Sequence, residues 1–127
     1  MPSGELSPGQ RQELARLLAH AEEQSGLTFS VYIGAWVGGR DGVEEKLAAL
    51  PDPDRSVVVA VDPDTRALEI VTGRLSRIAL DDHACGLAAL SMTSSFRADD
   101  LMGGLRDGLY VLADHGRRMR VFHVEQV

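Results

Sequence analysis

The stretch that decides the fold is Ser56–Gly73, SVVVAVDPDTRALEIVTG. It begins with Ser56–Val61, a continuous run of valine and alanine that is typical of a strand buried on both faces. The next four residues, DPDT at 62–65, have the composition of a tight turn. Arg66–Thr72 then alternates between apolar and polar residues until a glycine stops it. The stretch therefore predicts a β-hairpin at the centre of a sheet.

The chain before this hairpin predicts one long helix and one more strand. Ser7 and Gln10 have the spacing of a capping box, with Pro8 at the first helical position, so a helix is expected to begin there. Gly26 is the residue type that ends helices in a left-handed conformation. The alternating segment Leu27–Ile33 then predicts a strand with one apolar face.

A glycine-rich segment, residues 34–42, separates that strand from a short second helix. Asp41 and Glu44 have the spacing of a second capping box, and the helix is expected to end before Pro51. A strand, a helix and a strand in this order form a crossover unit, and such units join parallel strands. The first two strands are therefore predicted to be parallel.

After the hairpin, the linker Arg74–Leu80 leads to a third helix. Asp81 or Asp82 is expected to cap this helix, which fades at the serine-rich residues 91–95. Its inward-facing residues are expected to be Ala84, Leu87, Ala88 and Leu90.

A last helix is expected to start at Asp99 or Asp100 and to run to about Gly116. Its apolar residues recur at helical spacing, and the stripe consists of Leu101, Leu105, Leu109 and Leu112. The tail Met119–Val127 alternates weakly, which predicts either a short edge strand or a frayed end.

Together these elements predict one α/β domain over residues 1–127, with its core at about 4–116 and a C-terminal tail at 117–127. The architecture is expected to be a three-layer α/β/α sandwich around a small mixed sheet, with the first two strands parallel and the third antiparallel. The predicted core consists of Leu14, Leu17, Phe29, Val31, Val57, Val59, Val61, Leu68, Ile70, Leu87, Leu105, Leu109 and Leu112.

The composition narrows the classes of partner and location. Of 127 residues, 44% are apolar and 25% are charged, and the net charge is −6. An acidic chain argues against nucleic acid, whose binding needs clustered cations. No apolar run approaches the roughly 20 residues that span a bilayer, so no membrane insertion is expected. A single cysteine and a polar N-terminus favour a cytoplasmic protein whose partner is another protein or a small molecule.

Among side chains that can bind metals or take part in catalysis, only the carboxylates are abundant, with 19 Asp and Glu residues. Because the third strand runs back beside the second, its exit should lie beside Asp54 and Arg55, and the linker should bring Asp81 and Asp82 to the same edge of the sheet. These aspartates are the predicted ligands of a divalent cation (calcium, magnesium or manganese), and Arg55 or Arg77 is the predicted anion-binding residue. Asp99 and Asp100 lie one helix further along and are expected at the opposite edge.

The alternative is that these aspartates have only structural roles, with Asp81 capping a helix and Asp54 forming a turn. His83 and Cys85 lie two residues apart on a helix and point to different faces, so they form no nucleophile–base pair. The four histidines and the single cysteine are scattered and predict no zinc site.

The order of short motifs resembles the TPM domain family, small α/β/α proteins that are described as phosphatase-like. The matching motifs are Leu6-Ser7, Ser25-Gly26-Leu27, the strand Ser56–Val61, Leu68-Glu69-Ile70 with Gly73, and Phe96–Leu101 with Gly104 and Gly108. The segments GELS, FSVYIG, LEIVTG, SSF and DLMGGLRDGL resemble more closely an actinobacterial family known as domain of unknown function 5130. The resemblance covers roughly residues 4–116.

The resemblance implies the fold and two functional hypotheses. The loops in which the TPM family's metal and phosphate chemistry has been proposed differ here, as in Gly73-Arg74-Leu75-Ser76-Arg77. A non-enzymatic binding or scaffold module is therefore the favoured function. The alternative is a weak divalent-metal-dependent phosphatase acting on phosphate monoesters, which would need a convergent acidic cluster.

Overall fold

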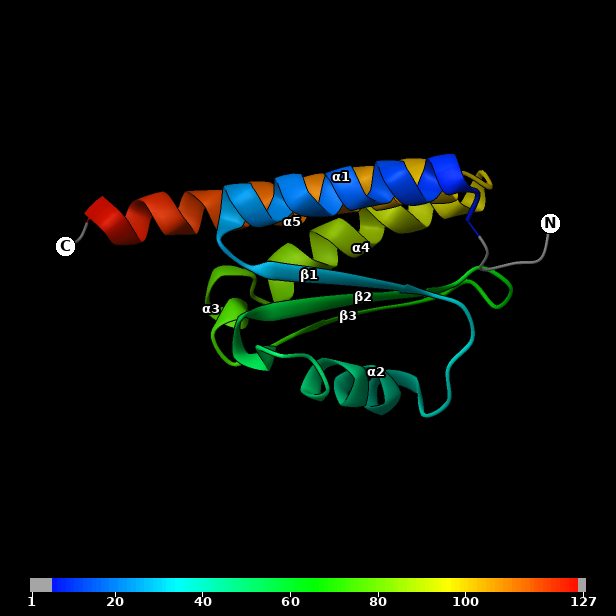
Figure 1. The fold of residues 1–127 in the computed structure, drawn as a ribbon, viewed down its shortest axis with the longest axis horizontal. Helices are drawn as coiled ribbons and strands as arrows, with labels where there is room; N and C mark the ends of the chain where they lie inside the picture. Colours follow the sequence, from blue (N-terminus) through cyan, green and yellow to red (C-terminus); the bar gives the residue numbers. More distant parts are fainter. Residues whose placement is uncertain (1–5, 126–127) are drawn as a thin grey trace.

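The computed structural model describes the backbone of residues 6–125 and the side chains of residues 6–120. Its elements, in chain order, are α1 (Pro8–Ser25), β1 (Thr28–Ile33), α2 (Gly39–Ala48), the short 3₁₀ helix η1 (Pro53–Arg55), β2 (Ser56–Asp62), β3 (Ala67–Thr72), α3 (Ser76–Ala79), α4 (Asp82–Arg97) and α5 (Leu101–Glu125). Figure 1 shows three layers, with α1, α4 and α5 on one face of the sheet and α2 on the other. The predicted α/β/α sandwich is confirmed.

The sheet has the predicted topology. Its strand order is β1-β2-β3. β1 runs parallel to β2 with Thr28 opposite Ser56, and β3 runs antiparallel to β2 with Thr72 opposite Val57. Every residue of β2 is buried, because helices cover both of its faces. The hairpin is therefore the centre of the fold.

The two faces of β2 belong to two separate apolar clusters. Val57, Val59 and Val61 pack into the large cluster beneath α1, α4 and α5. Val58 and Ala60 pack into a smaller cluster under α2. This alternation follows from the pleat of the strand, which sends successive side chains to opposite faces.

The predicted boundaries of α1 are confirmed in detail. The Gln10 backbone N–H donates to the Ser7 hydroxyl, and the Ser7 N–H donates to the Gln10 side chain. Pro8 occupies the first turn, and Gly26 ends the helix with φ +75°. A glycine is favoured there because this left-handed conformation strains residues with a Cβ.

The predicted cap of α2 is wrong. The helix begins at Gly39, and the residue before it, Gly38, occupies the cap position with φ +93°. Asp41 lies in the first turn of the helix, where its charge is favourable to the helix dipole, and makes no capping hydrogen bond. Two glycines allow the chain to turn into the helix three residues earlier than the capping box predicts.

The inward face predicted for α4 is partly wrong. Leu87 and Leu90 are exposed, whereas Ala84, Ala88 and Met92 are buried. The helix also continues through the serines to Arg97. The reason is close packing against α5, whose glycines leave room for the side chains of α4: a Cβ at Gly104 would lie 2.5 Å from the Phe96 ring, and one at Gly108 would overlap the Met92 side chain.

α5 does not end near Gly116 as predicted but continues to Glu125, so residues 119–125 are helical and form neither a strand nor a frayed end. The last two residues of the predicted tail, 126 and 127, lie outside the described residues. Gly116 is needed for packing, because a Cβ there would lie 2.6 Å from the Ser25 Cβ. The C-terminal part of α5 extends past the rest of the molecule (Figure 1). Within residues 6–125, no helix has both the length and the apolar character needed to cross a bilayer.

Candidate functional site

The exit of β3 lies beside the entrance to β2, as the sequence predicts. The Leu75 N–H donates to the Asp54 carbonyl (2.8 Å), and the Gly73 N–H donates to the Ser56 carbonyl (3.0 Å). The buried Ser76 hydroxyl accepts from the Gly73 N–H and donates to the Ser56 carbonyl, both at 2.8 Å. These bonds fix the start of α3 against the start of β2.

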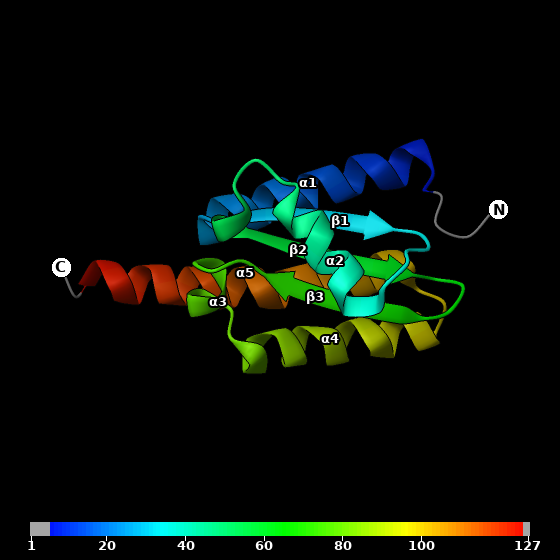
Figure 2. The same cartoon turned by 90° about the horizontal axis from the view of Figure 1, so that it is seen from below.

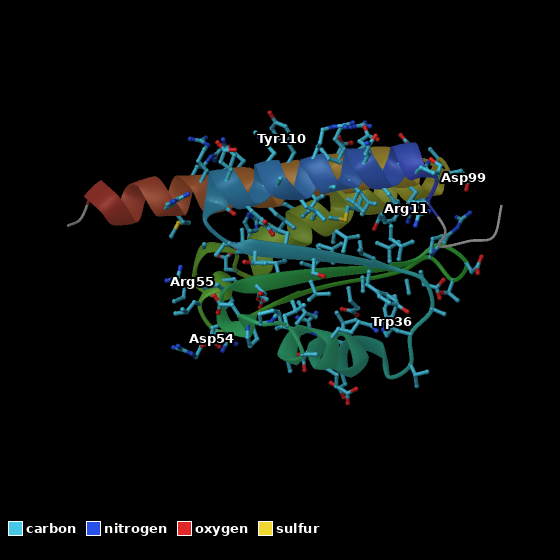
Figure 3. The ribbon with its side chains drawn as sticks, viewed as in Figure 1. Arg11, Trp36, Asp54, Arg55, Asp99 and Tyr110 are labelled. Carbon is cyan, nitrogen blue, oxygen red and sulfur yellow. The ribbon has the colours of Figure 1, made fainter. Side chains whose placement is uncertain are left out.

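α3 forms one wall of an open cleft at this end of the molecule. The cleft has a volume of about 460 Å³ and lies between the C-terminal end of α1, α3 and the C-terminal half of α5. We call it the α1–α3–α5 cleft. Its apolar lining consists of Leu27, Leu75, Ile78, Ala79 and Met119. Arg55, at the end of η1, also lines it (Figure 3).

The opposite wall is held by contacts between α1 and α5. The Ser25 hydroxyl donates to the Ala21 carbonyl (2.7 Å) and accepts from the Leu27 N–H (3.1 Å), so it is committed to ending α1. The Arg120 guanidinium packs over Gly26 and donates to the Glu23 carbonyl (3.1 Å). Arg120 is thereby held at the rim of the cleft.

The cleft combines an apolar surface with two permanent cations. Arg55 and Arg120 are its charged lining residues, and histidine, cysteine, lysine and carboxylates are absent from the described residues that line it. Guanidinium groups bind carboxylates and phosphates through paired N–H donors. The arrangement is therefore suited to binding an anion with an apolar part, and none of its described lining side chains is an ordinary general acid or base.

Of the two predicted anion-binding residues, the structure places Arg55 in this cleft. Arg77 is exposed on α3 and is not among the lining residues. Arg120 was missed, because the tail that contains it was not predicted to be helical. The sequence carries a signal in the cluster Arg117, Arg118 and Arg120, but the dipole at a helix C-terminus also favours such charges, so the cluster alone does not indicate a binding site.

The predicted metal ligands each have a local structural contact or lie on the surface. Asp54 pairs with Arg74 (Oδ2 to Nη2, 3.3 Å) at the surface. Asp81 caps α4, its Oδ1 accepting from the Ala84 N–H (2.9 Å), and Asp82 is exposed in the first turn. Among the described residues, no three His, Cys, Asp or Glu side chains lie close enough together to hold a metal ion. A cation at Asp54, Asp81 and Asp82 stays a prediction.

Asp99 lies at the opposite end of the sheet from Asp54 and Arg55, as expected (Figure 3). A hollow of about 280 Å³ is found there, lined by Asp62, Asp64, Arg66 and Asp99 among others. The Asp62 carboxylate accepts from the Asp64 N–H (3.0 Å) and so closes the hairpin turn. Asp62 and Asp64 are thus explained by the hairpin turn that contains them, and Asp99 lies in the connection between α4 and α5.

Cys85 lies on α4 and faces a hollow of about 220 Å³ between α4 and β3, which Arg40 and Asp82 also line. Burial, and then the negative charge of Asp82, raise the pKa of the Cys85 thiol to about 11. The thiol is therefore protonated at neutral pH and is a poor nucleophile.

We expect Cys85 to react slowly with thiol reagents. Compared with an ordinary thiol, the raised pKa lowers the thiolate fraction at pH 8 roughly a hundredfold. The measurement is the rate of reaction with a colorimetric disulfide reagent at pH 8, in buffer and in denaturing urea. Equal rates in the two conditions would show that the thiol is neither buried nor shifted.

Sequence comparisons identify the family of this chain. The chain matches, over residues 5–113, the family described as "Domain of unknown function (DUF5130)", and it belongs to that family. Two relatives are the uncharacterized protein MT2543 of Mycobacterium tuberculosis (strain CDC 1551 / Oshkosh) and the uncharacterized protein Rv2468c of Mycobacterium tuberculosis (strain ATCC 25618 / H37Rv). Each is 30% identical over 99 residues, which cover 76% of this chain and 58% of the relative. The match thus spans little more than half the length of these relatives.

Proposed function

We propose that this protein is a non-enzymatic binding module and that the α1–α3–α5 cleft binds a ligand with an anionic head and an apolar body. The observation that carries the proposal is the lining of this cleft. Two arginines lie at a surface whose other described lining residues are apolar, apart from Ser25 and two glycines. Its volume of about 460 Å³ lies within the usual range of small-molecule sites.

The chemistry of the lining supports binding without catalysis. Acid–base and nucleophilic catalysis need a titratable or activated side chain at the substrate. Among the described lining residues, Ser25 alone carries a hydroxyl, and both of its hydrogen bonds are made to the backbone at the end of α1. An apolar chain would pack on Leu75, Ile78 and Met119, while the guanidinium groups would bind the head.

The alternative, a weak phosphatase, is favoured by no contact among the described residues. The metal site that it would need, at Asp54, Asp81 and Asp82, stays a prediction. The relation to TPM domains is likewise proposed from motif order and from the α/β/α architecture. A cytoplasmic location and the absence of nucleic-acid partners are proposed from composition alone.

Titration calorimetry with decanoate tests the proposal, because decanoate carries one carboxylate and an aliphatic chain. We expect saturable binding of decanoate, with much weaker binding of acetate, which lacks the chain, and of decyltrimethylammonium, which has the opposite charge. Replacing Arg55 by alanine should weaken decanoate binding about five- to tenfold through loss of a charged hydrogen-bond donor at the rim.

The matched control is Arg77→Ala, which removes an exposed arginine of α3 outside the cleft. It should leave decanoate affinity unchanged. Equal losses in the two variants would indicate a nonspecific charge effect, and equal affinity for decanoate and decyltrimethylammonium would rule out recognition of the anion.

A further inference from the structure

α4 presents an apolar surface that no part of the described chain covers. The helix contacts α5 and β3 and forms one edge of its layer, as α1 forms the other (Figure 2). On its outer side, Leu90 is 71% exposed and Leu87 is 40% exposed. The exposed residues of α1, in the equivalent position, include no large apolar side chain. Of the two helices at the edges of this layer, only α4 exposes leucines to water among its described residues.

Gly86 is exposed one turn before Leu90, at the rim of the hollow that Cys85 lines, and is not needed for the packing of the chain itself. No atom lies within 4 Å of the position that a Cβ would occupy. The glycines of α5 differ, since a Cβ at Gly104 or Gly108 would collide with α4. A glycine inside a helix costs about 1 kcal/mol relative to alanine. Close approach of another helix would give this cost a structural reason.

The charges at the two ends of α4 are opposite. Asp82 lies in the first turn and Arg97 in the last, and neither forms an ion pair within the described residues. The fifteen steps between them correspond to about 22 Å of helix. A second α4 running antiparallel would bring the basic end of each helix to the acidic end of the other.

We propose that α4 pairs with α4 of a second copy in an antiparallel, two-fold symmetric dimer. In this arrangement Leu90 lies level with Leu87 of the partner subunit. The missing side chain at the partner's Gly86 then leaves room for Leu90 to pack against the partner helix. Arg97 then lies about 3 Å along the axis from the level of the partner's Asp82, within reach of its long side chain. A symmetric contact makes every such interaction twice.

Analytical ultracentrifugation of the full chain, from low to several hundred micromolar, tests the dimer. We expect reversible dimerisation that Leu90→Asp weakens at least tenfold, with the far-UV circular dichroism spectrum unchanged because Leu90 is exposed. The control is Val37→Asp, which places the same charge at a residue 92% exposed on the β1–α2 loop. It should leave dimerisation unchanged.

A charge exchange tests the antiparallel arrangement. Arg97→Asp alone should weaken the dimer, because it places two aspartates together at each end of the contact. Adding Asp82→Arg should restore it, because the pairs re-form with the charges exchanged. A parent chain that stays monomeric throughout the range would overturn the proposal, and so would a dimer insensitive to Leu90→Asp or a double variant that fails to recover. This test is independent of ligand binding in the α1–α3–α5 cleft.

Discussion

Gly73→Ala is expected to destabilise the protein by about 3 kcal/mol or more. A Cβ at residue 73 would overlap the Pro53 carbonyl oxygen and would lie 2.7 Å from that of Asp54. These are backbone atoms, and the bonds of Ser76 and Leu75 hold both sides of the contact. The strain cannot be relieved by a side-chain rotation, so the junction between β2 and α3 must open. Urea unfolding followed by circular dichroism measures the loss.

Gly9→Ala is the matched control for this prediction. Gly9 lies in the first turn of α1, and nothing lies within 4 Å of its Cβ position. Alanine there should leave stability unchanged or raise it by a few tenths of a kcal/mol. If Gly73→Ala and Gly9→Ala gave unfolding midpoints close to that of the parent, the close approach at Gly73 would be refuted.

Leu105→Ala is expected to cost about 2–5 kcal/mol. Leu105 is completely buried in the middle of α5, within the cluster that joins α1, α4 and the sheet. Truncation removes apolar contacts and leaves a cavity. The cavity cannot close, because α1, α4 and the sheet hold its walls in place. The measurement is the free energy of unfolding in urea, with the m-value checked for two-state behaviour.

Leu90→Ala is the comparison for this second prediction, because it makes the same chemical change at an exposed site. Measured at low micromolar concentration, it should change stability by less than about 0.5 kcal/mol. If both leucines cost the same, the assignment of the inner and outer faces of α4 and α5 would be wrong.

The central hairpin, the parallel pairing and the start of α1 could be predicted because local rules decide them. A run of valines has few alternatives to a buried strand, and Ser7 with Gln10 satisfies the first turn of a helix wherever that helix packs. The layers follow from the order of the elements. The adjacency of Gly73 and Asp54 followed from topology alone.

The inner face of α4 could be predicted only in part because it depends on a partner helix. Periodicity selects the largest apolar residues, Leu87 and Leu90, as the buried ones. Of the four predicted residues the helix buries only Ala84 and Ala88, since close packing on the glycines of α5 favours small side chains. The four-residue spacing of Gly104 and Gly108 is typical of close helix packing, but nothing local identifies α4 as the helix they contact.

Only one of the two arginines of the α1–α3–α5 cleft was predicted from the sequence, for a related reason. Arg55 was found because the hairpin brings its neighbourhood to the exit of β3. Arg120 was missed because Gly116 has two possible roles, a helix end or a packing contact, and the sequence favoured the first. Contact with Ser25 shows that the second applies and that α5 continues. The prediction of acidic ligands relied on aspartates whose roles in turns and caps are sufficient to explain them.

The measurement that tests the proposed binding function most directly is an NMR titration of the isotope-labelled protein with decanoate. The account predicts that the largest shift changes occur at the backbone of Arg55 and at the methyl groups of Ile78 and Met119, and that they saturate with one affinity. Changes centred on Asp62 and Asp99 at the opposite edge of the sheet, or no saturable change at all, would contradict it.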